Sequence, residues 1–333
     1  MYRKFLVGVS LAAQLVLATA VAGGVPAIAA DEKPVKPHMD LAFCIDTTGS
    51  MQGEIDTVKA KVRELVAKLS SGNPAPLIRV GLVAYRDRGD EYVTRIFPFS
   101  DDIDRFVKDI SNLRADGGGD GPEAVNQALH SAVHDLSWDA SSKTAKLLFL
   151  IGDAGPNKYK DDYDWRTESK NAISRGIQIN TIGCSGLEGY PAADGVDVFK
   201  QIAKLTDGKY DTLAYHQEVV TADGRKETMI SSGGAVYRVK AEGKDAWKAG
   251  AAALAAGGKL EKTSSVAAAS TRARSYGGLM AAPASLPAAG FAMAREADIG
   301  SGALSRRDNN LDEVLLQGAR AAAKKSLNVE FSR

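Results

Sequence analysis

The stretch that decides the fold is residues 40–51, which read Asp-Leu-Ala-Phe-Cys-Ile-Asp-Thr-Thr-Gly-Ser-Met. Its first seven residues form a short apolar run, the kind expected of a strand buried on both faces. From Met51 to Leu69 the apolar side chains recur at helical spacing. The chain therefore passes from a buried strand into an amphipathic helix through a short turn that carries an acid and several hydroxyls.

The same alternation of strands and helices continues to about residue 216. Strands are predicted at 40–46, 77–85, 92–99, 146–151, 176–183 and 209–213, and helices at 51–69, 101–113, 122–136, 164–175 and 195–206. This order predicts an α/β fold with a doubly wound, mostly parallel six-stranded sheet and helices on both of its faces. In such folds ligands bind beyond the carboxyl ends of the strands.

Three oxygen-rich loops fall at that edge of the predicted sheet. The first follows the strand at 40–46, the second is rich in glycine (116–123, Asp-Gly-Gly-Gly-Asp-Gly-Pro-Glu), and the third follows the strand at 146–151. Carboxylate and hydroxyl oxygens suit hard divalent cations, Mg²⁺ first and Ca²⁺ or Mn²⁺ next, whereas zinc and copper sites usually recruit His or Cys. The predicted metal ligands are Asp46, Thr48, Ser50, Asp120 and Asp153.

These three motifs, in this order, resemble the metal-ion-dependent adhesion site of a von Willebrand factor type A (VWA) domain. The resemblance covers about residues 38–216 and implies a Rossmann-like fold, with Asp46, Thr48 and Ser50 as first-loop ligands, directly or through water, and Asp153 as the third-loop contributor. The best-known members have a Thr in the second loop. Here Asp120 takes its place, as in a branch that resembles hemicentins, and a third carboxylate would weaken the attraction of the cation for an acidic partner.

Two of these residues also have a purely structural interpretation. Asp120 with Glu123 fits a capping box, with Pro122 in the first helical turn. Ser50 could simply cap the helix that begins at Met51. The pair formed by the first-loop and third-loop acids has no such alternative, because two acids at the ends of adjacent central strands repel each other unless a positive charge lies between them.

Signals of catalysis are weak in this sequence. His130 and His134 are four residues apart on a predicted helix, as in zinc peptidases, but Ser131 stands where those enzymes need a Glu, and a surface or packing role is favoured. Phosphate-binding glycine loops and the nucleophile elbow of hydrolases are absent. The sequence therefore predicts no enzyme. A metal-assisted hydrolase, with Glu123 or Asp116 as base, is the alternative.

The two cysteines are predicted to form no disulfide. Cys44 lies in the first strand and Cys184 follows the strand at 176–183, and the strand that ends before Asp153 is expected between them. Two steps of about 4.8 Å exceed the limit of about 7 Å between the Cα atoms of a disulfide. We expect two buried thiols.

The N-terminus predicts export. Arg3 and Lys4 precede an apolar run over 5–22, helix breakers follow, and Ala27-Ile28-Ala29 offers small residues before a cleavage site. We predict a signal peptide over 1–29, a linker over 30–37 and a periplasmic or extracellular protein. An uncleaved membrane anchor is the alternative.

Residues 217–333 differ from the predicted VWA domain, 38–216. Of the 60 residues from 241 to 300, 20 are Ala, which predicts a flexible tail with short strands and two helices, near 245–256 and at 311–327. The 42 bases and 41 acids of the chain give no reason to expect nucleic acid. These charges are unevenly divided: the VWA range has 27 acids and 21 bases, whereas the tail has 12 acids and 17 bases. The basic tail could therefore contact anionic envelope components.

Together these features predict an exported, non-enzymatic protein that binds a divalent metal and mediates metal-dependent protein–protein interaction or adhesion. The cation would complete its shell with an oxygen atom of the protein partner. Besides a hydrolase or an enzyme-accessory subunit that uses the same cation, an envelope-tethered structural protein is the other alternative.

Overall fold

The computed structural model describes residues 36–119, 121–189, 194–220, 226–240, 243, 245–263 and 308–332. The chain divides into two units, Met1–Val35 and Lys36–Arg333, and all of these residues belong to the second. The predicted signal peptide (1–29), Asp120 and residues 264–307 of the predicted tail lie outside them. Among the residues described, no helix is both long and apolar enough to cross a membrane.

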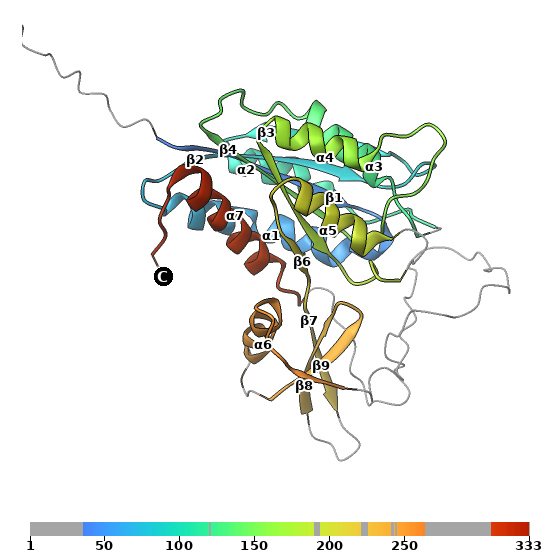
Figure 1. Ribbon diagram of the computed structural model, residues 1–333. Coiled ribbons are helices and arrows are strands. Elements are labelled where there is room, and N and C mark those ends of the chain that lie inside the picture. The colour runs from blue at the N-terminus through green and yellow to red at the C-terminus, as the bar shows by residue number, and fades with distance from the viewer. Residues whose placement is uncertain are drawn as a thin grey trace, which may run out of the picture. The chain divides into compact units, whose positions relative to one another are not determined.

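A six-stranded sheet forms the centre of the fold, with the order β3-β2-β1-β4-β5-β6 (Figure 1). The strands are β1 (His38–Asp46), β2 (Leu77–Tyr85), β3 (Thr94–Ser100), β4 (Thr144–Gly152), β5 (Ile177–Gly183) and β6 (Tyr210–Thr212). Neighbouring strands run parallel except β3, which is antiparallel to β2. The strand order reverses between β1 and β4, and this switch point is where ligands bind in open α/β sheets.

Helices cover both faces of this sheet, as the sequence predicted. They are α1 (Gln52–Ser70), α2 (Ile103–Asp109), α3 (Val125–His130), α4 (Trp165–Ser174), α5 (Gly195–Leu205) and α7 (Leu311–Leu327). Met39, Leu41, Phe43 and Ile45 of β1 pack into the core that holds α1, α2 and α7, whereas alternate residues of the strand pack with α3, α4 and α5. Because a strand points successive side chains to opposite faces, the predicted apolar run of β1 serves two cores. The doubly wound fold class is confirmed.

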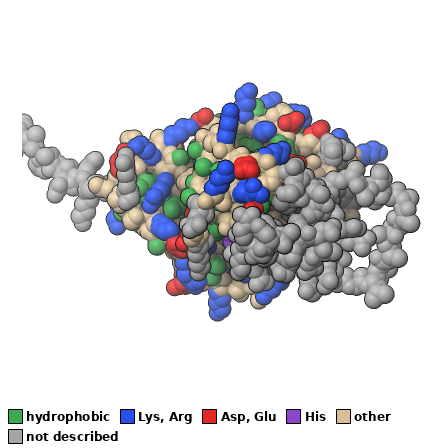
Figure 2. All heavy atoms as spheres, turned by 90° about the horizontal axis from the view of Figure 1, so that it is seen from below, with side chains coloured by type: hydrophobic (Ala, Val, Ile, Leu, Met, Phe, Trp, Pro, Cys, Tyr) green, Lys and Arg blue, Asp and Glu red, His purple; other side chains and the backbone are tan. Residues whose placement is uncertain are grey.

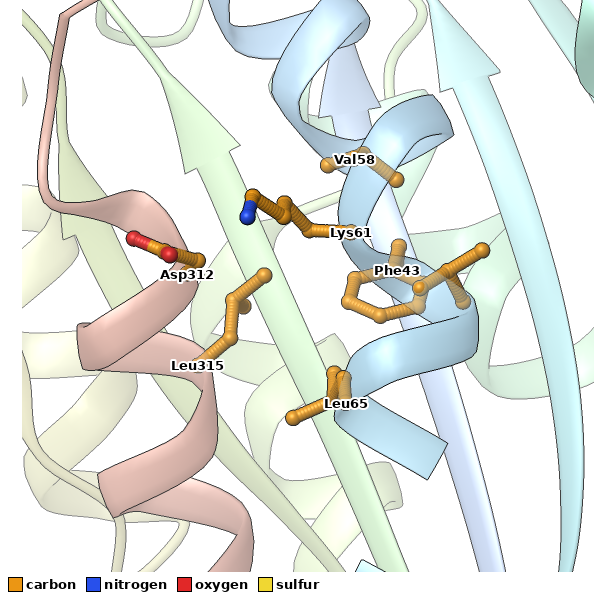
Figure 3. Close-up of a pocket in the computed structure, with 7 residues that line it drawn as sticks. Phe43, Val58, Lys61, Leu65, Asp312 and Leu315 are labelled. Atoms are coloured by element: carbon orange, nitrogen blue, oxygen red, sulfur yellow. The ribbon is translucent and has the colours of Figure 1, made fainter. Parts of the chain in front are cut away.

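The C-terminal helix α7 is part of the first core. Leu315, Ala319 and Ala323 are buried there with residues of α1 and β1. Figure 3 shows Leu315 beside Phe43 and Leu65, around a narrow cavity between α1 and α7. The core therefore extends beyond residue 216, the predicted end of the domain. The small side chains of α7, which resemble a linker in composition, allow the helix to lie close to the sheet.

A second, smaller antiparallel sheet lies between β6 and α7 in the chain. Its order is β10-β9-β8-β7, and it packs with α6 around Ile230, Val239 and Trp247. The bounds are β7 (Tyr215–Val220), β8 (Lys226–Ser232), β9 (Ala235–Val239), α6 (Ala246–Ala255) and β10 (Glu261–Lys262). The chain leaves and rejoins the first core at one place, where Tyr215 bridges to Asn309. The beginning of the predicted tail is thus a folded insertion.

The structure confirms the prediction for the two cysteines. Cys44 and Cys184 are buried and form no disulfide. Strand β4 lies between β1, which holds Cys44, and β5, which ends one residue before Cys184. Burial, and then the charge of Asp46, raise the pKa of the Cys44 thiol, so the reactive thiolate is disfavoured.

We therefore expect iodoacetamide to leave both thiols unmodified in the folded protein. In denaturant without reductant, mass spectrometry should show two alkyl groups per chain, because no disulfide has to be reduced first. Cys184→Ser serves as the control and should take up one alkyl group. An unchanged mass of the denatured, unreduced protein would contradict the assignment.

Candidate metal centre

The first loop begins at Asp46, the last residue of β1. Its side chain is fully buried. One carboxylate oxygen, Oδ1, accepts hydrogen bonds from the backbone N (2.8 Å) and from Oγ1 (2.7 Å) of Thr48. The other, Oδ2, is buried and has no hydrogen-bond partner. Asp46 thus shapes its own loop with one oxygen and leaves the second oxygen for a ligand.

The glycine-rich second loop lies directly against the first. The backbone N of Gly49 donates to the carbonyl of Gly117 (3.2 Å), and the backbone N of Asp116 donates to the carbonyl of Thr47 (3.0 Å). Gly118 has a φ of 73°, and a Cβ atom built there would lie 3.0 Å from Cβ of Thr48. Only glycine tolerates both this conformation and this approach. The predicted ligand that follows, Asp120, lies outside the described residues.

Glu123, at the end of the second loop, joins the site, whereas its sequence context predicts only a helix cap or a general base. It is buried, and its Oε2 has no hydrogen-bond partner. Its backbone N donates to the carbonyl of Gly155 (2.9 Å), which ties it to the third loop. Helix α3 begins only at Val125, with Ala124 as N-cap, so Glu123 does not occupy the third helical position that a capping box requires.

Asp153 begins the third loop, immediately after β4. Because β1 and β4 are adjacent and Ile45 pairs with Ile151, Asp153 emerges beside Asp46 at the switch point. Its side chain is buried. Ser50 is exposed on a short 3₁₀ turn, and α1 has Met51 as N-cap, so Ser50 is not the cap of that helix.

The carboxylates of this site oppose one another. The pKa of Asp46 is well above its usual value because the group is buried and, next, because it faces Asp153. Burial, followed by the charge of Asp46, raises the pKa of Glu123 to about 10. A divalent cation would relieve this repulsion.

The donor set therefore fits a hard divalent cation. It consists of oxygens only. Two of the buried ones, Asp46 Oδ2 and Glu123 Oε2, lack a hydrogen-bond partner, and the hydroxyls of Thr48 and Ser50 would add neutral oxygens. Among the predicted residues, the structure brings Asp46, Thr48 and Asp153 together and places Ser50 at the rim. The Gly-Pro-Glu sequence after the glycines was the available signal for Glu123.

A doubly wound sheet with three oxygen-rich loops at its switch point defines an open α/β domain of the Rossmann-like class. The chain belongs to the von Willebrand factor A domain family, whose model matches residues 40–213, more than half of the chain. This match confirms the family that the three sequence motifs resemble.

Curated relatives match part of the chain. The human von Willebrand factor A domain-containing protein 7 is 36% identical over 122 residues, which are 37% of this chain and 12% of that protein. The alpha-protein kinase vwkA of Dictyostelium discoideum is 32% identical over 118 residues, 35% of this chain and 18% of the kinase. The chain thus spans less than a fifth of the length of these curated relatives.

Two solved structures give weaker matches. Proximal thread matrix protein 1 of the mussel byssus has a TM-score of 0.40 and 17% identity over 53% of this chain and 42% of that chain. The SpRpn10 VWA domain has a TM-score of 0.38 and 12% identity over 54% of this chain and 87% of that chain.

Proposed function

We propose that this VWA protein is an exported, non-enzymatic module that binds a divalent metal and, through it, a protein partner. The observation that carries the proposal is the buried, unpartnered Oδ2 of Asp46 at the switch point, beside Asp153 and Glu123. Without a cation, a buried and unpaired carboxylate in this position destabilises the fold, whereas with a cation it would serve as a ligand.

Asp46, Thr48, Ser50 and Asp153 would hold the ion, Mg²⁺ first and Ca²⁺ or Mn²⁺ next, and Asp120 is the second-loop candidate. The bound ion supplies a coordination position for an oxygen atom of the partner. The chain's own contribution is to shape the loops: Asp46 fixes Thr48, and the backbone contact from Gly49 to Gly117 holds the first two loops together.

The positions of the two candidate bases, Glu123 and Asp116, do not favour an enzymatic role. Glu123 is buried among the carboxylates of the loop site, and its unpartnered Oε2 suits a cation ligand better than a base that must reach a substrate. The other candidate, Asp116, is exposed, and its Oδ1 accepts a hydrogen bond from the backbone N of Gly117 (2.9 Å). The proposed role is therefore non-enzymatic.

We also propose a cellular location for the protein. Residues 1–29 have the pattern of a signal peptide, so the module would act in the periplasm or outside the cell. Figure 2 shows one face, on which the described Lys and Arg side chains are scattered with acidic ones between them. The described part of this face therefore lacks the concentrated basic surface that nucleic acid binding demands. Contact of the basic tail with anionic envelope components belongs to the same proposal.

A pull-down from cell-envelope extract tests the function. Wild type with Mg²⁺ should retain a partner that is released by chelator, and Asp46→Ala should retain none, because the variant lacks a central ligand. Asp104→Ala, which changes an exposed acid of α2, is the matched control and should behave like wild type. Retention that is the same with chelator and in Asp46→Ala would contradict a metal-dependent interaction.

A further inference from the structure

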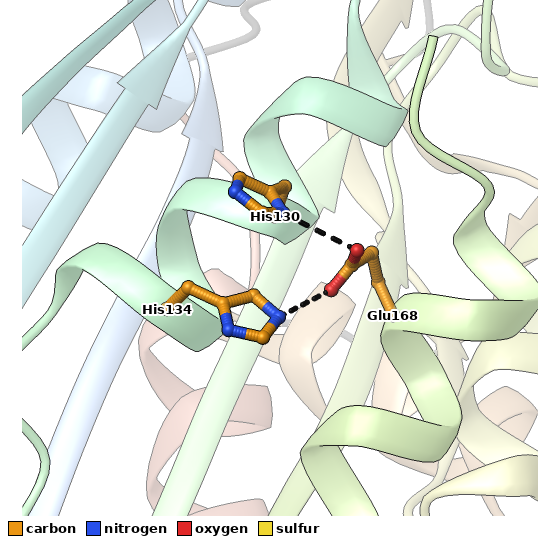
Figure 4. A group of neighbouring side chains, drawn as sticks. All are labelled: His130, His134 and Glu168. Carbon is orange, nitrogen blue, oxygen red and sulfur yellow. Dashed lines mark hydrogen bonds and ion pairs between the residues drawn. The ribbon is translucent and has the colours of Figure 1, made fainter.

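Two histidines and a glutamate meet between helices on the second face of the sheet. His130 ends α3, His134 lies in the π-helical segment η3 (Ser131–Asp135) that continues it, and Glu168 lies on α4. Nδ1 of His130 is 3.2 Å from Oε1 of Glu168, and Nε2 of His134 is 2.8 Å from Oε2 (Figure 4). One ligand atom from each of the three side chains can be chosen so that all lie within 4.8 Å of one another.

The local backbone and the neighbouring rings hold the histidines in this arrangement. The backbone N of Leu136 donates to the carbonyl of Ser131, which closes a turn over five residues. Such π-helical turns occur frequently at functional sites. The two imidazole rings stack with centroids 4.6 Å apart, and Tyr163 stacks on His130 at 3.6 Å. Both rings therefore present a nitrogen to the same carboxylate.

We propose that His130, His134 and Glu168 form a second metal site, of the zinc class, with three protein ligands and one position open to solvent. Two imidazoles and a carboxylate are an established ligand set for zinc, and bonds of about 2.0–2.1 Å place tetrahedral ligand atoms about 3.3 Å apart. Nδ1 of His130 lies 3.2 Å from Oε1 of Glu168 and Nε2 of His134 lies 2.8 Å from Oε2, so both nitrogens already approach the carboxylate that would complete the ligand set.

The surroundings of the three side chains match such a site. Glu168 is buried, whereas the side chains of His130 and His134 are 24% and 35% exposed, so an ion can enter from solvent. Nδ2 of Asn171 donates to Oε2 of Glu168 (3.2 Å), an outer contact that orients the carboxylate.

This cluster differs in chemistry from the loop site. Imidazole nitrogens suit zinc and neighbouring transition metals, whereas the oxygens around Asp46 suit Mg²⁺ and Ca²⁺. The zinc peptidase pattern uses two histidines four residues apart as ligands and a glutamate between them as general base. This chain has the two histidines, lacks that base, and brings a third ligand, Glu168, from another helix, 34 residues beyond His134. A bound ion would join η3 to α4 and stabilise the folded chain.

Calorimetry on the full chain, freed of any affinity tag and of metal, tests this second site. In excess Mg²⁺, Zn²⁺ should bind wild type with one ion per chain. His130→Asn, His134→Asn and Glu168→Gln should each weaken binding by more than about 100-fold, because loss of an outer contact alone costs 10–100-fold. His38→Asn, which changes an exposed histidine of β1, is the matched control and should bind zinc as wild type does.

A second readout separates ligand loss from misfolding. Zn²⁺ should raise the Tm of wild type, His38→Asn and Asp46→Ala, but not that of His134→Asn, whatever the Tm of each variant in chelator. Co²⁺ in place of Zn²⁺ should give the visible bands of a tetrahedral complex in wild type and not in His134→Asn. Absence of saturable zinc binding by wild type, binding that persists in His134→Asn, or binding that is lost in Asp46→Ala would each overturn the proposal.

Discussion

In protein freed of divalent cations, Asp46→Asn is expected to raise the free energy of unfolding by about 1–3 kcal/mol at neutral pH, because it removes a buried charge beside Asp153 and each unit of pKa shift costs about 1.4 kcal/mol. Asp46 is fully buried and its Oδ2 has no hydrogen-bond partner. Asparagine keeps an oxygen that can accept from Thr48 and removes the charge that faces Asp153. Most substitutions of buried residues destabilise a protein, so a gain is an unusual result.

The pH dependence of this gain has a defined sign. Burial, and then Asp153, raise the pKa of Asp46 in the folded state. In the unfolded chain the same group ionises near pH 4. Wild type in chelator therefore loses stability as the pH rises above about 4, because its unfolded state releases the proton more easily. The asparagine side chain of the variant does not titrate, so its advantage should grow from pH 5 to pH 8.

With saturating Mg²⁺ the order of stabilities should reverse. An ion that binds only the folded state stabilises it by about 2.7 kcal/mol at 100 times its Kd. Asp46→Asn lacks a carboxylate ligand and should gain little. Urea unfolding followed by circular dichroism, in chelator and in Mg²⁺, measures both differences. Asp104→Asn, with a side chain 83% exposed, should follow wild type in both. Equal stabilisation by Mg²⁺ in wild type and Asp46→Asn would show that the ion binds elsewhere.

The large sheet could be predicted from the sequence because its central strands, β1, β2, β4 and β5, are largely apolar runs bounded by turns. The predicted strand at 77–85 coincides with β2, and the buried side chains of β1 explain the run at 40–46. Helix α7 matches the predicted range 311–327, but its place in the core was not predicted. Its buried alanines carry little apolar surface, and their burial depends on how close the helix lies to the sheet. The spacing of apolar residues in the sequence does not predict that distance.

The candidate sites show the same division. Asp46 and Asp153 could be paired from the sequence, because the carboxyl ends of adjacent parallel strands meet at one edge. The Gly-Pro-Glu sequence marks Glu123 as an acid of the second loop, but its place at the site depends on where α3 begins, and helix boundaries are poorly marked when the start lacks a side-chain cap. Glu168 could not be paired with His134 either, because that contact depends on how α4 packs against η3.

Because α7 is part of the core, Leu315→Ala is expected to lower the free energy of unfolding by about 2–5 kcal/mol. This is the usual cost of replacing a buried leucine by alanine. Leu315 is 2% exposed and packs with Phe43, Val58 and Leu65 in the core shared by α1 and β1. Urea unfolding in the presence of Mg²⁺ measures the change. The matched control is Gln317→Ala, an exposed position two residues further along the helix, where the change should be within about 0.5 kcal/mol.

Gly318→Ala tests the packing of α7 on the sheet through the sign of the change in the free energy of unfolding. In a helix that touches nothing, this change stabilises by about 0.5–1 kcal/mol, because glycine is the poorer helix former. Here a Cβ atom at Gly318 would lie 2.9 Å from the ring of Phe149 and 2.8 Å from Nδ2 of Asn180, on β4 and β5. Overpacking of this kind costs about 1–3 kcal/mol, which exceeds the gain in helix propensity. A stabilised Gly318→Ala together with a neutral Leu315→Ala would mean that α7 does not pack on the sheet, whereas losses in both require that the final helix completes the domain core.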